Sequence, residues 1–428
     1  MLSTRVATTS LAHFLACAGT LIGGLGVGSL RAELGEVTAS ASTTAMGHSP
    51  INARDGKRFG IEPAHTWRGA AGEASWWWEA KFDQPESIGA ILQITGDHDF
   101  VHRNAPRSYV WQVSDDELNW RDLTETRQTN DARSFRVLRL KKVETVRAIR
   151  LRIDGVAGDA PVLREIELYP TSDAAIAFPD WIVAVNTTHD GALPGHGQEF
   201  MPLAKSCDGW AELQAQQVWL DTFTPGFIAI EPRPLAAFLS GNFKDWCEVD
   251  RKLWGGTAEI LKQANLPMWA SCGGAQGLAI LAETGVEQPW DCPHCRDPKK
   301  PRLPIYGHIG HTGSQLKCGD YSACIHERGP HEVVKVGNDP VFAGLPDAFQ
   351  VMESHCGQIE WPPAGWSLIA TAGQGTVTKV QCLRVDGRPI YAAQFHIEMA
   401  GTPENSRRIM GNFLKLASDW GDHQTRAR

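Results

Sequence analysis

The sequence has no surplus of positive charge and, beyond its first 32 residues, no long uncharged apolar run. Its 428 residues carry 41 Lys and Arg against 49 Asp and Glu, a formal net charge of −8. A protein that binds a phosphate backbone needs a basic surface, so nucleic acid is not expected as a partner. No later stretch is long and apolar enough to cross a bilayer, so no integral membrane span is expected in the mature chain.

The composition is that of a folded protein. Hydrophobic residues make up 42% of the chain and charged residues 21%, a balance that is too apolar for a disordered chain. At roughly 150 residues per domain, the length predicts two to three domains, each large enough to bury its own core. Two folded domains are therefore expected.

The first 32 residues resemble a secretory signal. Arg5 precedes an apolar, Gly-rich stretch at 11–30 that carries no formal charge, and Arg31-Ala32 precede the polar sequence. This order is typical of a signal peptide and predicts a secreted or periplasmic protein. An uncleaved anchor is the alternative, since about 20 residues can span a bilayer, although the five glycines of the stretch weaken it.

Residues 33–170 contain short apolar runs separated by polar turns and no convincing helix. The runs lie at 90–94, 109–113, 137–140, 149–153 and 165–169. Such runs at these spacings predict a β-sandwich. The aromatic faces of Trp67 and of the W-W-W run at 76–78 could stack on sugar rings. Alternate tryptophans of a strand could instead face the core.

The order of the motifs in this segment resembles the discoidin family, also called the coagulation-factor type C domain. The motifs are N-A-R-D-G at 52–56, T-W at 66–67, W-W-W at 76–78, S-D-D at 114–116 followed by Trp120, and R-E-I-E-L at 164–168. The resemblance implies an eight-stranded jelly roll whose loops at one end bind carbohydrate or a lipid surface. Trp67 and Trp76 are our candidate carbohydrate-binding residues, and no metal site is expected, since carboxylates in turns usually bind backbone donors.

Past a linker at 171–179, strand-like and helix-like stretches alternate. We expect strands at 181–185, 227–230, 235–239 and 266–270, and helices at 202–218, 248–265 and 273–284. Strands that alternate with helices predict an α/β domain around a parallel sheet, here over residues 180–421, with a disordered tail at 422–428.

Cys272 lies in a sharp turn between one of these strands and the helix that begins at Gly273. A nucleophile in such a turn is exposed, faces the positive end of the helix dipole and has backbone N–H groups nearby that can stabilise an oxyanion. Gly273 and Gly274 allow the turn to be tight. The attacking species of a cysteine is its thiolate, which a helix N-terminus favours.

A strand at 389–394 leads into the sequence F-H-I-E at 395–398. Side chains two residues apart on an extended segment share a face, so Glu398 can orient His396. His396 can then take the proton of Cys272. The three residues predict a Cys-His-Glu triad.

The two motifs together resemble the class I glutamine amidotransferase family, which has a flavodoxin-like fold. In that family they read G-x-C-x-G-x-Q and Q-F-H-P-E, and here they read A-S-C-G-G-A-Q at 270–276 and Q-F-H-I-E at 394–398. The resemblance implies that Cys272 is the nucleophile, His396 the general base and acid, and Glu398 the carboxylate that orients it.

The same resemblance implies further site residues. Gly273 and Gly241 would supply the N–H groups of the oxyanion hole, and Gln276, Ser354 and His355 would bind substrate. The sequence departs from the family pattern at Ala270, where glycine is usual, at Ile397, where proline is usual, and at 356–357, where Cys-Gly replaces Gly-Asp. Because of these departures, the resemblance does not fix the identity of the substrate. The three residue types of the triad are all present.

We therefore expect an exported cysteine hydrolase that cleaves a γ-carboxamide or γ-glutamyl amide of a small molecule or peptide through a thioester. Transfer of ammonia would need a synthase domain, and the sequence shows only a sandwich beside the amidotransferase-like domain. Nothing in the sequence implies an organic cofactor. The alternative is a non-catalytic carbohydrate- or surface-binding protein with a degenerate amidotransferase-like domain.

A cluster of cysteines lies between the two motifs, at Cys292, Cys295, Cys318 and Cys324. In an exported protein their spacing favours two disulfides. A structural zinc site and free thiols are the alternatives.

Overall fold

The computed structural model describes residues 37–188, 193–263, 266–288, 290, 305–310, 321–322 and 324–426, with side chains as far as residue 421. The expected signal peptide at 1–32 lies outside these residues, as do Cys292, Cys295 and Cys318. Glu33–Arg428 forms one compact unit. No helix of the described residues is long and apolar enough to cross a membrane.

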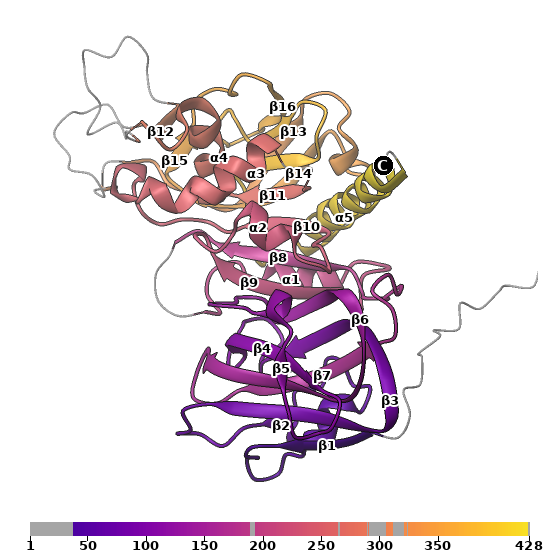
Figure 1. Ribbon diagram of the computed structural model, residues 1–428. Coiled ribbons are helices and arrows are strands. Elements are labelled where there is room, and N and C mark those ends of the chain that lie inside the picture. The colour runs from indigo at the N-terminus through magenta and orange to yellow at the C-terminus, as the bar shows by residue number, and fades with distance from the viewer. Residues whose placement is uncertain are drawn as a thin grey trace, which may run out of the picture. The chain divides into compact units, whose positions relative to one another are not determined.

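The N-terminal part of this unit is an antiparallel sandwich (Figure 1). Its strands are β1 (Val37–Ala41), β2 (Trp67–Arg68), β3 (Trp76–Thr95), β4 (Pro106–Ser114), β5 (Arg121–Asp122), β6 (Phe135–Val156) and β7 (Val162–Tyr169). They are ordered β2-β7-β3-β6-β4-β5, and β1 pairs with β3. The predicted sandwich is confirmed, and every predicted apolar run lies in one of these strands; the described residues supply seven strands where the resemblance implied eight.

The tryptophans of the sandwich build its core. On β3 the side chains alternate, so Trp76 and Trp78 are buried while Trp77 is partly exposed. Trp67 is fully buried, and its indole N–H donates to the Thr43 carbonyl at 3.2 Å. The indole of Trp76 donates to the Ala70 carbonyl at 2.8 Å. The prediction that Trp67 and Trp76 contact carbohydrate is therefore wrong, because neither ring offers a face to solvent.

The C-terminal part is built on a nine-stranded mixed sheet. The parallel half contains β9 (Gln214–Trp219), β8 (Trp181–Asn186), β10 (Ala236–Leu239), β11 (Met268–Ser271) and β18 (Ile390–Ala393), in that order. The sheet continues antiparallel through β17 (Cys382–Val385), β16 (Trp366–Ala372), β13 (Glu327–Lys335) and β14 (Ala348–His355). A separate ribbon pairs β12 (Tyr306–His308) with β15 (Gly357–Ile359). The predicted parallel sheet is thus present, extended by antiparallel strands that the sequence analysis did not assign.

The helices of this part are α1 (Phe200–Lys205), α2 (Pro225–Ala229), α3 (Gly255–Gln263), α4 (Gly273–Thr284) and α5 (Pro403–Arg426). The helix predicted at 202–218 is wrong beyond α1, because the buried run at 214–219 is strand β9. The strand predicted at 227–230 is also wrong, because Pro225 and an N-cap bond from Phe227 N–H to Thr224 start α2 there. The predicted disordered tail is wrong through Arg426, where α5 ends.

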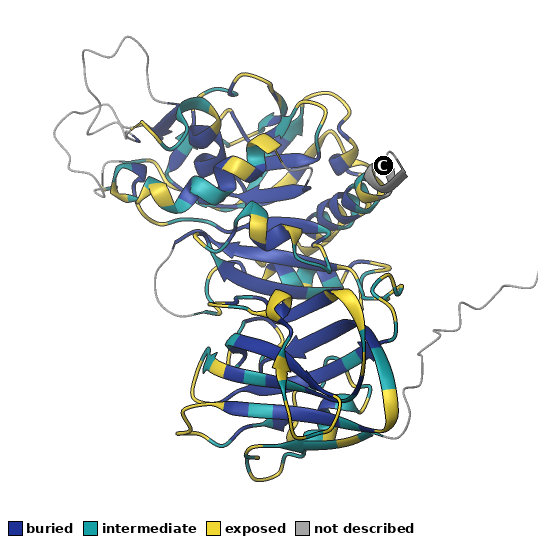
Figure 2. Ribbon diagram, in the orientation of Figure 1, coloured by how far each residue is buried: buried dark blue, intermediate teal, exposed yellow. Residues whose placement is uncertain are grey.

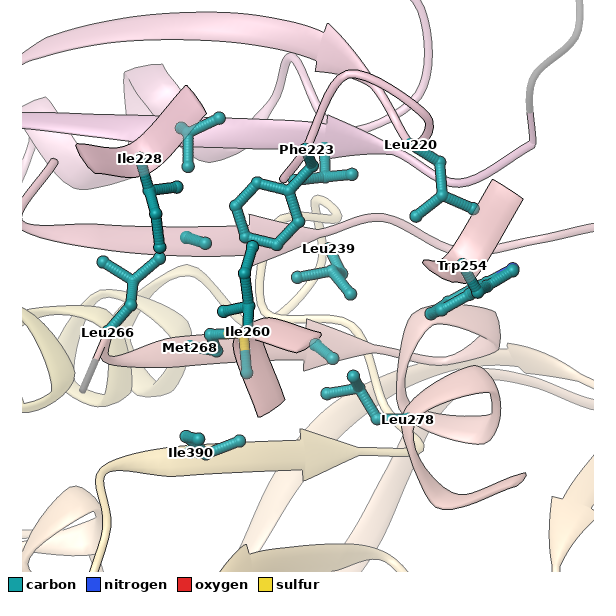
Figure 3. Packing of buried hydrophobic residues seen from close by; sticks show 14 of the residues in the cluster. Leu220, Phe223, Ile228, Leu239, Trp254, Ile260, Leu266, Met268, Leu278 and Ile390 are labelled. Atoms are coloured by element: carbon teal, nitrogen blue, oxygen red, sulfur yellow. The ribbon is translucent and has the colours of Figure 1, made fainter. Parts of the chain in front are cut away.

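Helices cover both faces of the sheet, and the parallel strands β8, β10, β11 and β18 are buried along their length (Figure 2). On one face, side chains of the central strands pack against α3 and α4; Figure 3 shows Leu239, Met268, Ile260 and Leu278 among them. On the other face, Trp269 of β11 packs against Phe413 of α5. Because adjacent residues of β11 point to opposite faces, one short strand anchors both layers.

A buried arginine ties the sandwich to α2. The Arg133 guanidinium donates to the carbonyls of Phe227 at 3.0 Å and Pro232 at 2.8 Å. It also lies 4.4 Å from the centre of the Trp181 ring. Burial lowers the pKa of Arg133 to about 9. The residue therefore links elements that are about 100 residues apart in the chain, through contacts that require a dry environment.

Candidate active site

The site begins at the turn between β11 and α4, where Cys272 has φ +48° and ψ −112°. A non-glycine residue adopts a positive φ only when its surroundings hold it there. The Cys272 N–H donates to the Ala393 carbonyl at 2.7 Å, and its own carbonyl accepts from the Gln276 N–H at 3.0 Å. A side chain at Gly273 would begin 2.2 Å from the backbone N of Asn242. The tight, glycine-dependent turn that the sequence predicts is present.

His396 and Glu398 lie beside this turn. The Nδ1 atom of His396 is 2.7 Å from Oε1 of Glu398, and the ring lies close enough to Cys272 for the two groups to interact electrostatically. Burial disfavours a charged ring, but Glu398 and Cys272 outweigh it and hold the pKa of His396 well above its usual value. The backbone N–H of His396 donates to the Met352 carbonyl at 2.9 Å, which holds the main chain at His396 against β14. The structure thus brings the three predicted triad residues together.

A fourth residue supports the triad and was not predicted. The Ser271 hydroxyl donates to Oε2 of Glu398 at 3.0 Å and accepts from the indole N–H of Trp269 at 3.1 Å. Each oxygen of Glu398 therefore has its own partner, His396 on one and Ser271 on the other. The only sequence signal for this contact is a serine next to the nucleophile. Ser271 and Glu398 are 127 residues apart in the chain, so the sequence pattern does not predict that they meet.

The two glycines predicted for the oxyanion hole flank Cys272. A side chain at Gly241 would begin 3.3 Å from Cε1 of His396 and 3.9 Å from Cβ of Cys272. The backbone of the loop after β10 therefore passes directly beside both reacting side chains. Gly273 follows the nucleophile and packs against the same loop at Asn242.

The side chain of Gln276 hydrogen-bonds to other residues of the protein. Its amide donates to the Gly357 carbonyl at 2.9 Å and to Oε1 of Gln394 at 3.1 Å, and its oxygen accepts from Trp246 at 3.1 Å. Gln394 in turn donates to the Cys272 sulfur at 3.7 Å. Both N–H donors of Gln276 are therefore bound to other protein groups. The structure shows Gln276 positioning Gln394 beside Cys272, in place of the predicted contact with substrate.

His355 also faces inward, whereas Ser354 borders the nucleophile. The His355 Nδ1 is 2.9 Å from the Gly357 carbonyl, and its Nε2 lies 2.8 Å from Glu353 and 3.4 Å from Glu327. Both nitrogens face acceptors; burial opposes a charged ring, but Glu353 raises the pKa of His355. The prediction that the His355 side chain binds substrate is not supported by these contacts. The carbonyl of Ser354 lies 3.9 Å from the Cys272 sulfur.

The cysteines near the site leave Cys272 as a free thiol. Cys356, at a position where the family often has glycine, is half-buried, and burial raises the pKa of its thiol to about 12. Cys324 hydrogen-bonds to Cys356. The predicted partners of Cys324 lie outside the described residues, so the choice between disulfides and zinc stays a prediction. Among the described side chains, no group of three or more His, Cys, Asp and Glu is arranged to hold a metal ion.

A second polar cluster lies on loops of the sandwich. Arg68 contacts Asp159 at 2.6 Å, and Asp97 accepts from Arg103 at 2.8 Å and from Asn104 at 2.7 Å. Burial opposes the charge of Asp97, but the hydrogen bonds from Arg103 and Asn104 lower its pKa. We call these five residues the loop cluster. It presents paired guanidinium and carboxylate groups, with Arg103 and Asp159 more than half exposed.

Comparison with known protein families agrees with both halves of this architecture. The F5/8 type C domain family matches residues 36–168, and the class-I glutamine amidotransferase family matches residues 213–416. The chain joins an F5/8 type C domain to a class-I glutamine amidotransferase domain. The amidotransferase match includes Cys272, His396 and Glu398.

Individual relatives include glutamine-hydrolysing GMP synthases. A glutamine-hydrolysing GMP synthase of Thermus thermophilus is 33% identical over 140 residues, which is 29% of this chain and 27% of that protein. The corresponding enzyme of Nitratidesulfovibrio vulgaris is 33% identical over 119 residues, 26% of this chain and 22% of that protein. The matches thus span about a quarter of the length of these curated relatives.

Two solved structures are similar to parts of this chain. A candidate GMP synthase component of Thermoplasma acidophilum is 19% identical with a TM-score of 0.42, and the match covers 58% of this chain and 100% of that one. A chitosan-binding module of a Paenibacillus chitosanase/glucanase is 20% identical with a TM-score of 0.26, and the match covers 32% of this chain and 95% of that one.

Proposed function

We propose that this protein is a cysteine-dependent hydrolase of γ-carboxamide or γ-glutamyl-type amides and that its F5/8 type C domain binds carbohydrate or a related surface. The arrangement of Cys272, His396 and Glu398 at the strained turn carries the first half of the proposal. The names of the matched relatives, which hydrolyse glutamine, support the same chemistry.

The contacts of the site define each step. The Cys272 thiolate attacks the amide carbon, and a C–S bond forms as the carbonyl oxygen becomes an oxyanion near the N–H groups of Gly273 and Gly241. The His396 imidazolium gives its proton to the leaving nitrogen as the C–N bond breaks. His396 then takes a proton from water, whose oxygen attacks the thioester and releases the acid and the Cys272 thiolate. Glu398 stabilises the charged ring in both steps.

We favour hydrolysis over transfer because the domain joined to the amidotransferase fold is a binding-type sandwich and not a synthase. The loop cluster is our candidate for the carbohydrate contact of that domain. Guanidinium and carboxylate groups held side by side can bind neighbouring hydroxyls of a sugar, the first as donors and the second as acceptors. This assignment replaces the buried Trp67 and Trp76.

We further propose that the protein acts outside the cytoplasm. The support is the order of Arg5, the uncharged stretch at 11–30 and Arg31-Ala32 in the sequence. Fractionation of cells that express the full chain tests this proposal. A product whose mass corresponds to cleavage after Ala32 in the medium or periplasm supports it, and a full-length product confined to the cytoplasm contradicts it.

The first experiment measures the intact mass of the protein after incubation with a glutamine-like diazo ketone, which traps thiolates in glutamine-shaped pockets. We expect one adduct that is lost in Cys272→Ala and kept in Cys356→Ala, since the high pKa of the Cys356 thiol makes it unreactive near neutral pH. An unmodified protein with reduced Cys272 would contradict the glutamine-directed function. It would favour the alternative of a non-catalytic binding protein.

A further inference from the structure

An exposed aromatic side chain lies beside the nucleophile. Phe243 is 66% exposed, although most large apolar side chains of this domain are buried. It follows Gly241 and Asn242, which contact His396 and Gly273 as described above. Because two residues of extended chain span about 7 Å at most, Phe243 borders the mouth of the site.

A second ring, from a different segment, packs against Phe243. The ring centres of His196 and Phe243 are 4.6 Å apart, and the rings meet edge to face at 63°. The next residue, Gly197, has a φ of +94°, and a side chain there would begin 3.1 Å from Cβ of Ser240. The segment of His196 is therefore held against the loop after β10. We call His196 and Phe243 the aromatic pair.

The aromatic pair lies within reach of the leaving group. Nδ1 of His396 is held by Glu398, so Nε2 is the atom that gives the proton to the leaving nitrogen. That nitrogen must come within about 3 Å of Nε2. Gly241 packs against Cε1, the ring carbon between the two nitrogens. A substituent on the leaving nitrogen is therefore within reach of the loop that carries Phe243, whereas ammonia would be too small to reach it.

We infer that the preferred substrates are γ-glutamyl-type amides whose leaving amine carries a flat ring, which packs on His196 and Phe243. The inference rests on the proposed function and narrows its substrate class. Aromatic faces bind both aryl rings and the apolar face of a sugar ring. In the reaction the C–N bond breaks, the amine leaves with the proton of His396, and water supplies the hydroxyl of the released acid.

The test compares the kcat/KM values of matched substrates. γ-Glutamyl benzylamide carries an aryl ring, a γ-glutamyl amide of glucosamine carries a sugar ring, and γ-glutamyl ethylamide and glutamine carry neither. We expect the wild-type protein to prefer a ring-bearing amide over the ethylamide by about three- to tenfold, the range that one aromatic contact supplies. Whether the aryl or the sugar substrate is faster identifies the ring.

Two variants of the aromatic pair make the test specific. Phe243→Ala should reduce the ring preference to about onefold, and His196→Ala should reduce it in part, while both leave glutamine turnover unchanged. Leu118→Ala, which removes a side chain that is 81% exposed on the sandwich, serves as the matched control. Equal kcat/KM values for ring-bearing and ringless amides, or a preference that survives Phe243→Ala, would overturn the inference while Cys272-dependent hydrolysis still stands. Absence of Cys272-dependent turnover of every substrate would overturn the proposed function and the inference with it.

Discussion

Removal of the Ser271 hydroxyl should slow the reaction without removing any triad residue. In Ser271→Ala, Oε2 of Glu398 loses a donor at 3.0 Å and the buried Trp269 indole loses its acceptor at 3.1 Å. A hydrogen bond to a charged group contributes about 1.5–3 kcal/mol, which corresponds to roughly 10- to 150-fold in rate. The unsatisfied indole should in addition lower the free energy of unfolding by about 1–3 kcal/mol.

Kinetic and adduct measurements together distinguish a misoriented triad from a lost nucleophile. We expect kcat for glutamine or a γ-glutamyl amide to fall in Ser271→Ala, with little change in KM, while the Cys272 adduct with the diazo ketone still forms, more slowly. Ser271→Thr keeps a hydroxyl and should recover most of the rate. A Ser271→Ala protein with kcat within twofold of the wild type would refute the role that we give to this contact, because Glu398 would then hold His396 unaided.

Three other variants test the remaining contacts. Cys272→Gly should raise the free energy of unfolding by about 1 kcal/mol or more, since glycine accepts the positive φ; chemical denaturation that shows a loss would contradict this. The raised pKa of His355 means that its charge stabilises the fold fully below its unfolded pKa of about 6.5 and less as the pH rises through the folded pKa. The unfolding deficit of His355→Gln should therefore shrink from pH 6 to pH 9, and a constant deficit would exclude the charge effect. Asp97→Asn should weaken glycan binding in an affinity gel and leave amide hydrolysis unchanged, and unaltered retention would exclude the loop cluster.

The parts of the active site that the sequence predicted are those fixed by local geometry. A strand, two glycines and a helix dictate the turn at Cys272, and α4 begins and ends where the pattern placed it. His396 and Glu398 share a face because they are two residues apart. The resemblance to amidotransferases then supplied the long-range pairing of this segment with Cys272.

The wrong predictions concern features that depend on tertiary contacts: one strand, the burial of two tryptophans and the partners of site residues. The sequence pattern assigned most of the run at 214–219 to a helix, but pairing with β8 makes it a strand. Trp67 and Trp76 looked like exposed platforms because sequence alone does not say which face of a strand meets the core. Gln276 and His355 match family positions, but their partners, such as Trp246 and Glu353, come from other elements. Ser271 was missed for the same reason.

The distance along the chain between Cys272 and His396 has a consequence for biosynthesis. The nucleophile is complete once β11 and α4 have formed, but its base arrives 124 residues later, on a strand that inserts beside β11 and is held by the Met352 carbonyl. A nascent chain that has released the sandwich and half of the second domain from the ribosome carries Cys272 but not yet His396 and Glu398. The order of synthesis thus leaves the triad incomplete until the last strand of the sheet is in place.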